Sequence, residues 1–443
     1  MKNKIIKFTF ILTIGGLITK LLGMIIKIVL TRTIGQYAMG IYSLILPTYL
    51  VLVNISMFSL PNTLNILIST NKYNNKNLIA TSLLISLIIN SIIMIFIIFG
   101  YKYIALNLLK SEYTELGILS IGFILPFISI SNIFRSYIFA KEKIKLHVLT
   151  NIIEDTIKLL LFIFVLPKVI SKGINITVAF IFLTNIICEL SSIIIFLVFI
   201  PKFKATKKDI IPNIHNTKEI LKISLPALGS RLISTLGYFL EPIILTFVLL
   251  KVGYTTDFII NEYGIINGYV LQLVLLPSFF TLALSQAIIP TISKAFANKK
   301  YKYVKNKIIQ AIIISILIGI PFTIIFILFP KQLLNILFKT TKGVKYIKVL
   351  APIAILHYIQ AILSTSLQSI NKSKTLIKTT FIGTILRCIT LYLFSLLKIG
   401  LFSLVIATSI NILYTTLSNA KQLFKYLDSL ILNKQSNHLT FDN

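Results

Sequence analysis

Twelve long apolar segments dominate this 443-residue sequence. A helix needs about 20 apolar residues to cross the roughly 30 Å hydrocarbon core of a bilayer. The segments are continuous rather than alternating, so they predict helices and not the strands of a barrel. They lie near residues 6–30, 38–66, 79–100, 115–139, 147–167, 174–200, 219–250, 260–290, 306–329, 346–370, 376–397 and 400–424. We therefore expect an all-α integral membrane protein with about twelve transmembrane helices.

The composition excludes a soluble fold of this length. Hydrophobic residues make up 56% of the chain, charged residues only 13%, and the mean hydropathy is +0.90, whereas soluble domains are about 25% charged. The two cysteines, Cys188 and Cys388, have no CxxC spacing, so neither a metal site nor a disulfide framework is predicted. The first segment, which begins MKNKIIKF, is too long and has the wrong flank for a cleaved signal peptide.

The net charge of +31 predicts an orientation in the membrane. With the N-terminus in the cytoplasm, 26 of the 44 basic residues fall in cytoplasmic segments, 11 in outside loops and seven within helices. This asymmetry fits the positive-inside rule, although the outside loop PKQLLNILFKTTKGVKYIK is also rich in lysine. We expect a multi-pass protein of the cytoplasmic membrane with both termini cytoplasmic, and no nucleic-acid partner, because the basic residues sit in separate short loops.

Several short patterns recur in the two halves of the chain. LITKLLG at 17–23 is followed by LISTLG at 232–237, and AKEK at 140–143 by NKSK at 371–374. The proline pair Pro47 and Pro61 likewise recurs as Pro277 and Pro290. Since each half has six segments, this predicts a parallel repeat in which both copies face the same way. The expected organisation is a six-helix lobe at 1–200, a cytoplasmic linker at 201–218, a second six-helix lobe at 219–427 and a cytoplasmic tail at 428–443.

A protein of two like-oriented lobes has a natural binding cleft between them, where transporters bind substrate and alternate access. Pro47, Pro61, Pro277 and Pro290 each remove a backbone hydrogen bond, so we interpret them as hinges, together with the small Gly23. The alternative is that these prolines are only tolerated, as prolines often are in membrane helices.

The first segment carries charges where lipid would disfavour them. In GGLITKLLGMIIKIVLTR, residues Gly16, Lys20, Gly23 and Lys27 fall on one helical stripe. A lysine at the bilayer centre costs roughly 2.5–3.5 kcal/mol. We therefore expect Lys20 and Lys27 to face a wet cavity or an anionic partner. The alternative for Lys27, and for Arg32, is that the side chain reaches the headgroups at the outer end, which Lys20 cannot easily do.

Other charged residues inside the segments leave two interpretations open. Glu154 and Lys158 are one helical turn apart and can pair with each other. Alternatively, Glu154 and Asp155 bind the Na⁺ or H⁺ that drives transport. Arg135 is expected to extend toward the cytoplasmic headgroups, and Glu189 also lies within an apolar segment.

Two charged residues of the seventh segment belong to the second copy of the repeat. Arg231 and Glu241 both lie there, and the repeat places Glu241 opposite Lys27. Opposite charges at such related positions could pair across the closed cleft, which gives Glu241 an expected role in gating.

The motifs of ATP-driven transport and of common hydrolases are missing from the sequence. It has no GxxxxGK[ST], HExxH or GxSxG pattern. We therefore expect a transport protein rather than an enzyme, with no cofactor other than a coupling Na⁺ or H⁺.

Two stretches carry a family resemblance. LITKLLGMIIKIVLTRTIGQYAMGIYSLILPTYLVLVNISMFSLPNTLNILIS and NEYGIINGYVLQLVLLPSFFTLALSQAIIPTISKA resemble the stage V sporulation protein B family, in the polysaccharide-exporter branch of the MOP flippase superfamily. The resemblance implies a V-shaped, two-lobe fold like that of MATE transporters and lipid II flippases. It also implies that the protein flips an undecaprenyl-diphosphate-linked saccharide, a peptidoglycan precursor for the spore cortex.

The resemblance can be carried over residue by residue. Lys20 matches the basic residue that precedes LG in the cationic cavity of lipid II flippases. Lys27 replaces an acidic residue of those proteins, and Gln272 replaces an arginine five residues before Pro277. The predicted substrate-binding set is Lys20, Lys27, Arg231 and Gln272. Many members have two further C-terminal helices, whereas this sequence has twelve segments, so we expect any role of those two helices to be absent.

Two other functions stay open at this point. A cation-coupled multidrug extruder of the same fold would depend on Glu154 and Asp155 rather than on the lysines. A membrane scaffold that recruits cell-wall synthases would depend on its loops, which are short here. The partners we expect are membrane lipids, a lipid-linked saccharide and cell-wall synthases, with the chain itself monomeric.

Overall fold

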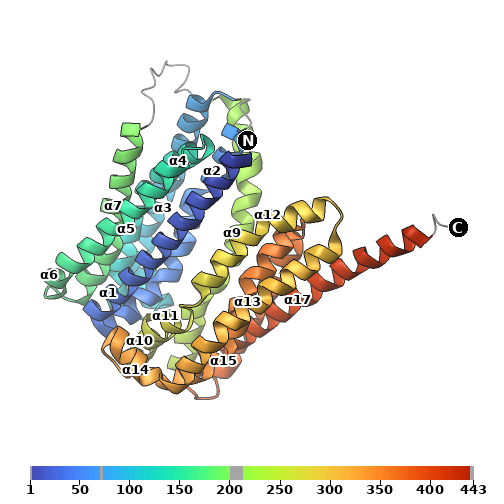
Figure 1. Ribbon diagram of the computed structural model, residues 1–443. Helices are drawn as coiled ribbons and strands as arrows, with labels where there is room; N and C mark the ends of the chain where they lie inside the picture. Colours follow the sequence, from blue (N-terminus) through green and yellow to red (C-terminus); the bar gives the residue numbers. More distant parts are fainter. Residues whose placement is uncertain (1, 70–72, 200–212, 440–443) are drawn as a thin grey trace. The chain divides into compact units, whose positions relative to one another are not determined.

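The structure is a computed structural model that describes residues 2–69, 73–199 and 213–439. Within these ranges the chain is helical with short turns and no strand, as the apolar segments predicted (Figure 1). Each of the twelve segments coincides with helix. Nine helices of the described ranges are long and apolar enough to cross a membrane. Residues 201–212 of the expected linker lie outside the described ranges.

The chain divides into two compact units, Met1–Gly268 and Tyr269–Asn443. The first unit contains nine α-helices of the described chain: α1 (Lys2–Met57), α2 (Leu60–Ser69), α3 (Asn75–Tyr103), α4 (Glu115–Ala140), α5 (Ile144–Phe164), α6 (Leu166–Ile170), α7 (Ile174–Phe199), α9 (Ile214–Lys251) and α10 (Thr256–Ile265). A π-helical turn at Ile104–Leu108 and a 3₁₀ turn at Glu112–Thr114 connect α3 to α4.

Helix α1 contains two of the expected spans, joined without a loop. The joint is Gly35, whose φ of 73° and ψ of −179° lie outside the helical region and bend the helix. An L-residue rarely adopts this conformation, so glycine is the residue that permits the joint. The second span ends at Met57, earlier than the expected 66, because Phe58 and Ser59 have φ angles of 48° and 52°. A new helix, α2, then begins at Leu60.

Helix α4 is the central helix of the first unit and packs against α7, α3 and α2. A buried cluster that includes Leu60, Leu64, Ile133, Tyr137 and Phe196 fills the contact between these helices. In contrast, α3 exposes large apolar side chains such as Phe99, which is 83% exposed. An exposed apolar surface of this kind is stable only when lipid covers it.

Helices α9 and α10 pack against α1 and so belong to the first unit. A Cβ added at Gly40 would lie 2.0 Å from the Ile260 carbonyl oxygen, and one at Gly264 would lie 2.1 Å from that of Gln36. The two backbones therefore touch at this crossing. The linker predicted at 201–218 divides the two copies of the sequence repeat, and this division stays a prediction. The two compact units of the structure instead meet in the sequence after Gly268.

Two polar contacts flank the crossing of α1 and α10. Gln36 Nε2 donates to Asn261 Oδ1 at 2.8 Å, and the Tyr37 hydroxyl donates to Asp257 Oδ1 at the same distance. The ring of Tyr37 also meets that of Tyr113 edge to face at 5.8 Å. The crossing is thus fixed by close backbone contact and by side-chain hydrogen bonds together.

The second unit contains seven helices of the described chain: α11 (Leu271–Val274), α12 (Ser278–Ala297), α13 (Tyr301–Leu328), α14 (Pro330–Phe338), α15 (Val344–Ser369), α16 (Ser373–Ser395) and α17 (Phe402–Leu439). Helix α15 packs against α12, α13 and α17 around a buried cluster that includes Ile308, Ile362 and Leu423. The lysine-rich loop after 329 contains a short helix, α14, which begins at Pro330. Proline lacks a backbone N–H, but the first N–H groups of a helix have no acceptor within the helix, so proline costs no hydrogen bond there.

The eighth expected span is broken between α11 and α12. Ser278 N donates to Leu275 O rather than to Val274 O, which would be its partner in a continuous helix. The freed carbonyl of Val274 accepts a hydrogen bond of 2.6 Å from the Tyr358 hydroxyl of α15. Tyr358 is fully buried beside Gly319, so packing holds its hydroxyl against the break.

The four prolines predicted as hinges lie in two kinds of place. Pro61 follows the break at Phe58 and Ser59, and Pro277 lies at the break before α12. Pro47 and Pro290 lie inside the continuous helices α1 and α12. The hinge role of all four stays a prediction.

Candidate functional site

The charged residues of the membrane-spanning helices gather in the first unit, where α1, α4, α5 and α7 pack together. Helix α5 is absent from the nine candidate spans of the described chain, and it carries Glu154, Asp155 and Lys158 near its middle. Polar groups at that depth need partners on neighbouring helices. The site is built from these partners.

Arg135 of α4 is held by carboxylates from two other helices. Its Nη2 lies 2.6 Å from Glu154 Oε2 of α5 and 3.9 Å from Glu189 Oε2 of α7. The Ser192 hydroxyl donates a second hydrogen bond, of 3.1 Å, to the same Glu154 oxygen. The side chains of Arg135, Glu154 and Glu189 are 19%, 21% and 10% exposed. We call these three residues and Ser192 the acidic network.

Lys158 lies one turn further along α5 and has a different partner. Its Nζ donates to Asn185 Oδ1 of α7 at 2.8 Å, and Asn185 in turn donates to the Phe182 carbonyl. The local pairing of Glu154 with Lys158 that the sequence suggested is therefore wrong. Glu154 pairs instead with Arg135, which is 19 residues away and does not extend to the headgroups as expected.

Lys20 and Lys27 lie on an unpacked face of α1. Both side chains are exposed, and a methyl group added at Gly16 or Gly23 would meet no atom within 4 Å. Lys20 and Lys158 are both near enough to Lys27 for their charges to act on it. The three ammonium groups come from two helices, α1 and α5, that pack against each other. We call Lys20, Lys27 and Lys158 the cationic cluster.

The other predicted site residues lie on other helices, α9 and α11. Glu241 of α9 is buried and accepts a hydrogen bond of 3.0 Å from the Tyr263 hydroxyl of α10. Arg231 is half-buried on α9, and Gln272 is half-buried on α11 of the second unit. The gating role of Glu241 and the binding roles of Arg231 and Gln272 stay predictions.

Sequence reasoning gave no role to several residues of the site. Glu189, Asn185 and Ser192 fall at spacings of four and three on α7, so they form one polar stripe in an otherwise apolar helix. That stripe was a usable signal. Arg135 gave no such signal, because its contact with Glu154 depends on how α4 packs beside α5.

A bundle of apolar helices that carries a cationic cluster and a mostly buried acidic network is the build of a multi-pass membrane transport protein. Comparison with known proteins places it among flippases and exporters. The chain belongs to the family described as polysaccharide biosynthesis protein, which it matches over residues 5–296. Residues 266–393 also match the MatE family.

Named relatives agree with this assignment. The chain is 27% identical to stage V sporulation protein B of Bacillus subtilis over 96% of this chain and 85% of the relative. It is 20% identical to the lipid II flippase MurJ of Bacillus subtilis, over 88% of this chain and 77% of that protein. The resemblance read from the sequence is confirmed. The expectation of a transport protein rather than an enzyme is confirmed as well, since the relatives are transporters.

Solved structures confirm the fold. An inward-facing multidrug-resistance MATE transporter of the MOP superfamily matches with a TM-score of 0.77 at 15% identity, over 93% of this chain and 95% of that chain. An outward-facing MATE transporter matches with a TM-score of 0.62 at 14% identity, over 96% of both chains. The all-α, MATE-like membrane fold that the sequence predicted is thus established.

Proposed function

We propose that the protein flips an undecaprenyl-diphosphate-linked saccharide across the cytoplasmic membrane by alternating access. The observation that carries this proposal is the cationic cluster, in which Lys20 and Lys27 are exposed on α1 and Lys158 lies on α5, the helix that packs against α1. A diphosphate cannot enter hydrocarbon unpaired, because burial of its charge would cost tens of kcal/mol in a medium of low dielectric constant. Ammonium groups in a wet space offer it charge-assisted hydrogen bonds, while the polyprenyl tail stays in lipid.

The family match and the relatives support a lipid-linked saccharide as the cargo. The likeness to stage V sporulation protein B favours a peptidoglycan precursor of the spore cortex. We further propose that the chain acts as a monomer with both termini in the cytoplasm. Cell-wall synthases are the partners that such a cargo would require.

A flip assay in liposomes tests the proposal. A fluorescent undecaprenyl-diphosphate-linked disaccharide is placed in both leaflets, and dithionite then destroys the fluorophores that the protein brings outward. We expect Lys20→Ala and Lys27→Ala each to slow this loss about tenfold, the effect of one lost hydrogen bond to a charged group. Lys20→Arg keeps the charge and should retain most of the rate.

Lys102→Ala is the matched control, because Lys102 is an exposed lysine on α3, away from the cluster. It should flip at the rate of the unchanged protein. Full activity of the Lys20→Ala, Lys27→Ala double variant would overturn the assignment of a diphosphate to the cationic cluster.

A second candidate function, cation-coupled multidrug export, is favoured by the acidic network. Glu154, Asp155 and Glu189 place three carboxylates beside two cations, Arg135 and Lys158. Three carboxylates and two cations leave one carboxylate in excess. A carboxylate in excess is the kind of group that binds Na⁺ or H⁺ in a transporter. Both candidates can use it, since a flippase can also be driven by an ion gradient.

Glu154→Gln tests this coupling. We expect the variant to lose the dependence of its transport rate on sodium and proton gradients, because the amide takes up no proton and offers Na⁺ no negative charge. Glu112→Gln, an exposed position before α4, is the control. If the gradient dependence of Glu154→Gln is unchanged, Glu154 serves only to hold Arg135. Export of cationic drugs without any lipid flipping would favour the second candidate.

A further inference from the structure

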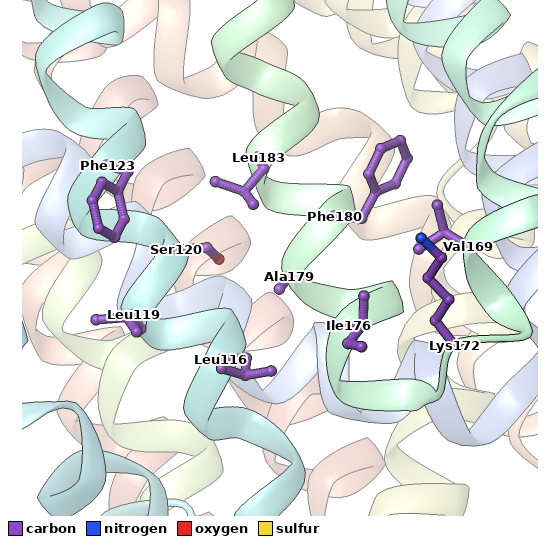
Figure 2. Close-up of a pocket in the computed structure, with 10 residues that line it drawn as sticks. All are labelled: Leu116, Leu119, Ser120, Phe123, Val169, Lys172, Ile176, Ala179, Phe180 and Leu183. Carbon is purple, nitrogen blue, oxygen red and sulfur yellow. The ribbon is translucent and has the colours of Figure 1, made fainter.

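A groove in the first unit lies outside the charged site. It has a volume of about 370 Å³ and is lined by ten residues of α4, α6 and α7 and the turn between α6 and α7. Figure 2 shows Leu116, Leu119, Ser120 and Phe123 on one wall, and Ile176, Ala179, Phe180 and Leu183 on the other. The four residues from α7 follow one another at helical spacing, so one face of α7 forms an entire wall.

The walls of the groove offer almost no polar group. Ser120 is the one hydroxyl among the ten lining residues, and it already donates a 2.7 Å hydrogen bond to the Gly117 carbonyl. Phe123 and Leu116 are 48% and 39% exposed, so the groove is open to the surroundings of the helices. Because α4 and α7 are both candidate spans, those surroundings are lipid. An apolar space of this size favours a hydrocarbon occupant over water.

Lys172 gives the groove a charge at one end. It lies in the turn between α6 and α7, next to Gly173, whose φ is 106°. Its side chain is exposed and runs beside Ile176 and Phe180 (Figure 2). The turn directly precedes the candidate span α7, and the end of a span lies at the level of the lipid headgroups, where a lysine attracts phosphate. Lys168 at the end of α6 adds a second positive charge nearby.

We propose that this groove binds one acyl chain of an anionic phospholipid, with its phosphate held by Lys172. The hydrocarbon chain covers the apolar walls, and the charged end of the groove selects the headgroup. The site is independent of the flipped cargo, since it shares no residue with the cationic cluster. Glu112 and Glu115 lie before and at the start of α4, at the same end of the bundle, so a zwitterionic phosphatidylethanolamine is the competing occupant.

The absence of tryptophan from the sequence permits a direct test. Phe123→Trp introduces a single fluorescent reporter into the groove wall of the full-length protein. The protein is reconstituted with lipids brominated on the acyl chain, which quench tryptophan on contact. Phe99→Trp is the control, because Phe99 faces lipid on α3 and does not line the groove. Both positions lie near the ends of α3 and α4 that the turns at 104–114 connect, and so at similar depth.

We expect brominated phosphatidylglycerol to quench Phe123→Trp at about one fifth of the mole fraction that brominated phosphatidylethanolamine needs. This factor corresponds to the roughly 1 kcal/mol that one lysine contributes at an anionic surface. Lys172→Gln should remove the preference, and Phe99→Trp should show none. Lys168→Gln should reduce the preference only in part.

Three outcomes would overturn the proposal. The first is equal quenching of Phe123→Trp by the two lipids. The second is a preference that survives Lys172→Gln. The third is quenching of Phe123→Trp no stronger than that of Phe99→Trp at any mole fraction, which would mean that no lipid resides in the groove. Ala179→Phe gives a second check, because a ring there should fill the groove and abolish the preference while leaving flipping intact.

Discussion

Single residues of the site depend on partners that are distant in the sequence. Arg135 sits between Glu154 and Glu189, so one guanidinium compensates two carboxylates in a mostly buried place. Removal of one member of a buried ion pair costs more than the pair itself contributes, because the remaining charge is left without compensation. The acidic network should therefore be most sensitive to the loss of its cation.

We expect Arg135→Gln to lower the free energy of unfolding by about 3–5 kcal/mol. Unfolding can be followed through the thiol of Cys188, which is buried beside Glu189, in a Cys388→Ser background with a thiol-reactive dye. The double variant Arg135→Gln, Glu154→Gln should recover part of the loss, because it removes an uncompensated carboxylate. Lys102→Gln is the neutral control, and an Arg135→Gln protein as stable as that control would contradict the described pairing.

At the scale of elements, the crossing of α1 and α10 depends on the absence of side chains at Gly40 and Gly264. The nearest backbone oxygen lies about 2 Å from where a Cβ would stand at either residue. No rotamer change relieves a contact with backbone, so the helices would have to separate. The hydrogen bonds from Gln36 and Tyr37 would then lengthen or break.

Gly40→Ala should accordingly lower the unfolding temperature and loosen α10 from α1. Gly229→Ala on α9 is the matched control, since nothing lies within 4 Å of its Cβ position. An alanine in place of a helical glycine normally gains about 0.5–1 kcal/mol, so the control should be unchanged or more stable. Hydrogen exchange at 256–265 measures the loosening. Equal behaviour of the two alanine variants would refute the close crossing.

The elements differ in how well the sequence predicted them. Helix location followed from the need to satisfy every backbone hydrogen bond in lipid, so all twelve segments were found. Pro61 and Pro277 marked both regions as expected hinges, but the sequence did not predict that the helices break at Phe58–Ser59 and before Ser278. The Tyr358 hydroxyl that accompanies the second break is 84 residues from Val274. Its role depends on packing that no local pattern reveals.

For the whole molecule, the distribution of basic residues is the property that the sequence shows best. It predicts which loops face the cytoplasm but not which helices pack together. Helices α9 and α10 belong to the second lobe by repeat and to the first unit by packing. In the same way, Lys20 and Lys27 were singled out from their cost in lipid, whereas Lys158 joined them only once α5 was seen to pack against α1.

The orientation can be tested with single cysteines in a Cys188→Ser, Cys388→Ser background. Asn298→Cys and Gln332→Cys are both exposed and both leave the basic residues in place. A maleimide that cannot cross membranes should label Gln332→Cys on intact cells and Asn298→Cys only after the membrane is opened. The opposite labelling pattern would reverse the assigned topology.

Gly35 is the point at which α1 bends. Lys20 and Lys27 of the cationic cluster precede it in α1, and Gly40, where α1 crosses α10, follows it. The helix joins these two places without an intervening loop. If the two lysines bind a headgroup, as proposed, the force on them reaches the contact with α10 through one achiral residue. Arrival of the cargo and loosening of that contact would then be mechanically coupled.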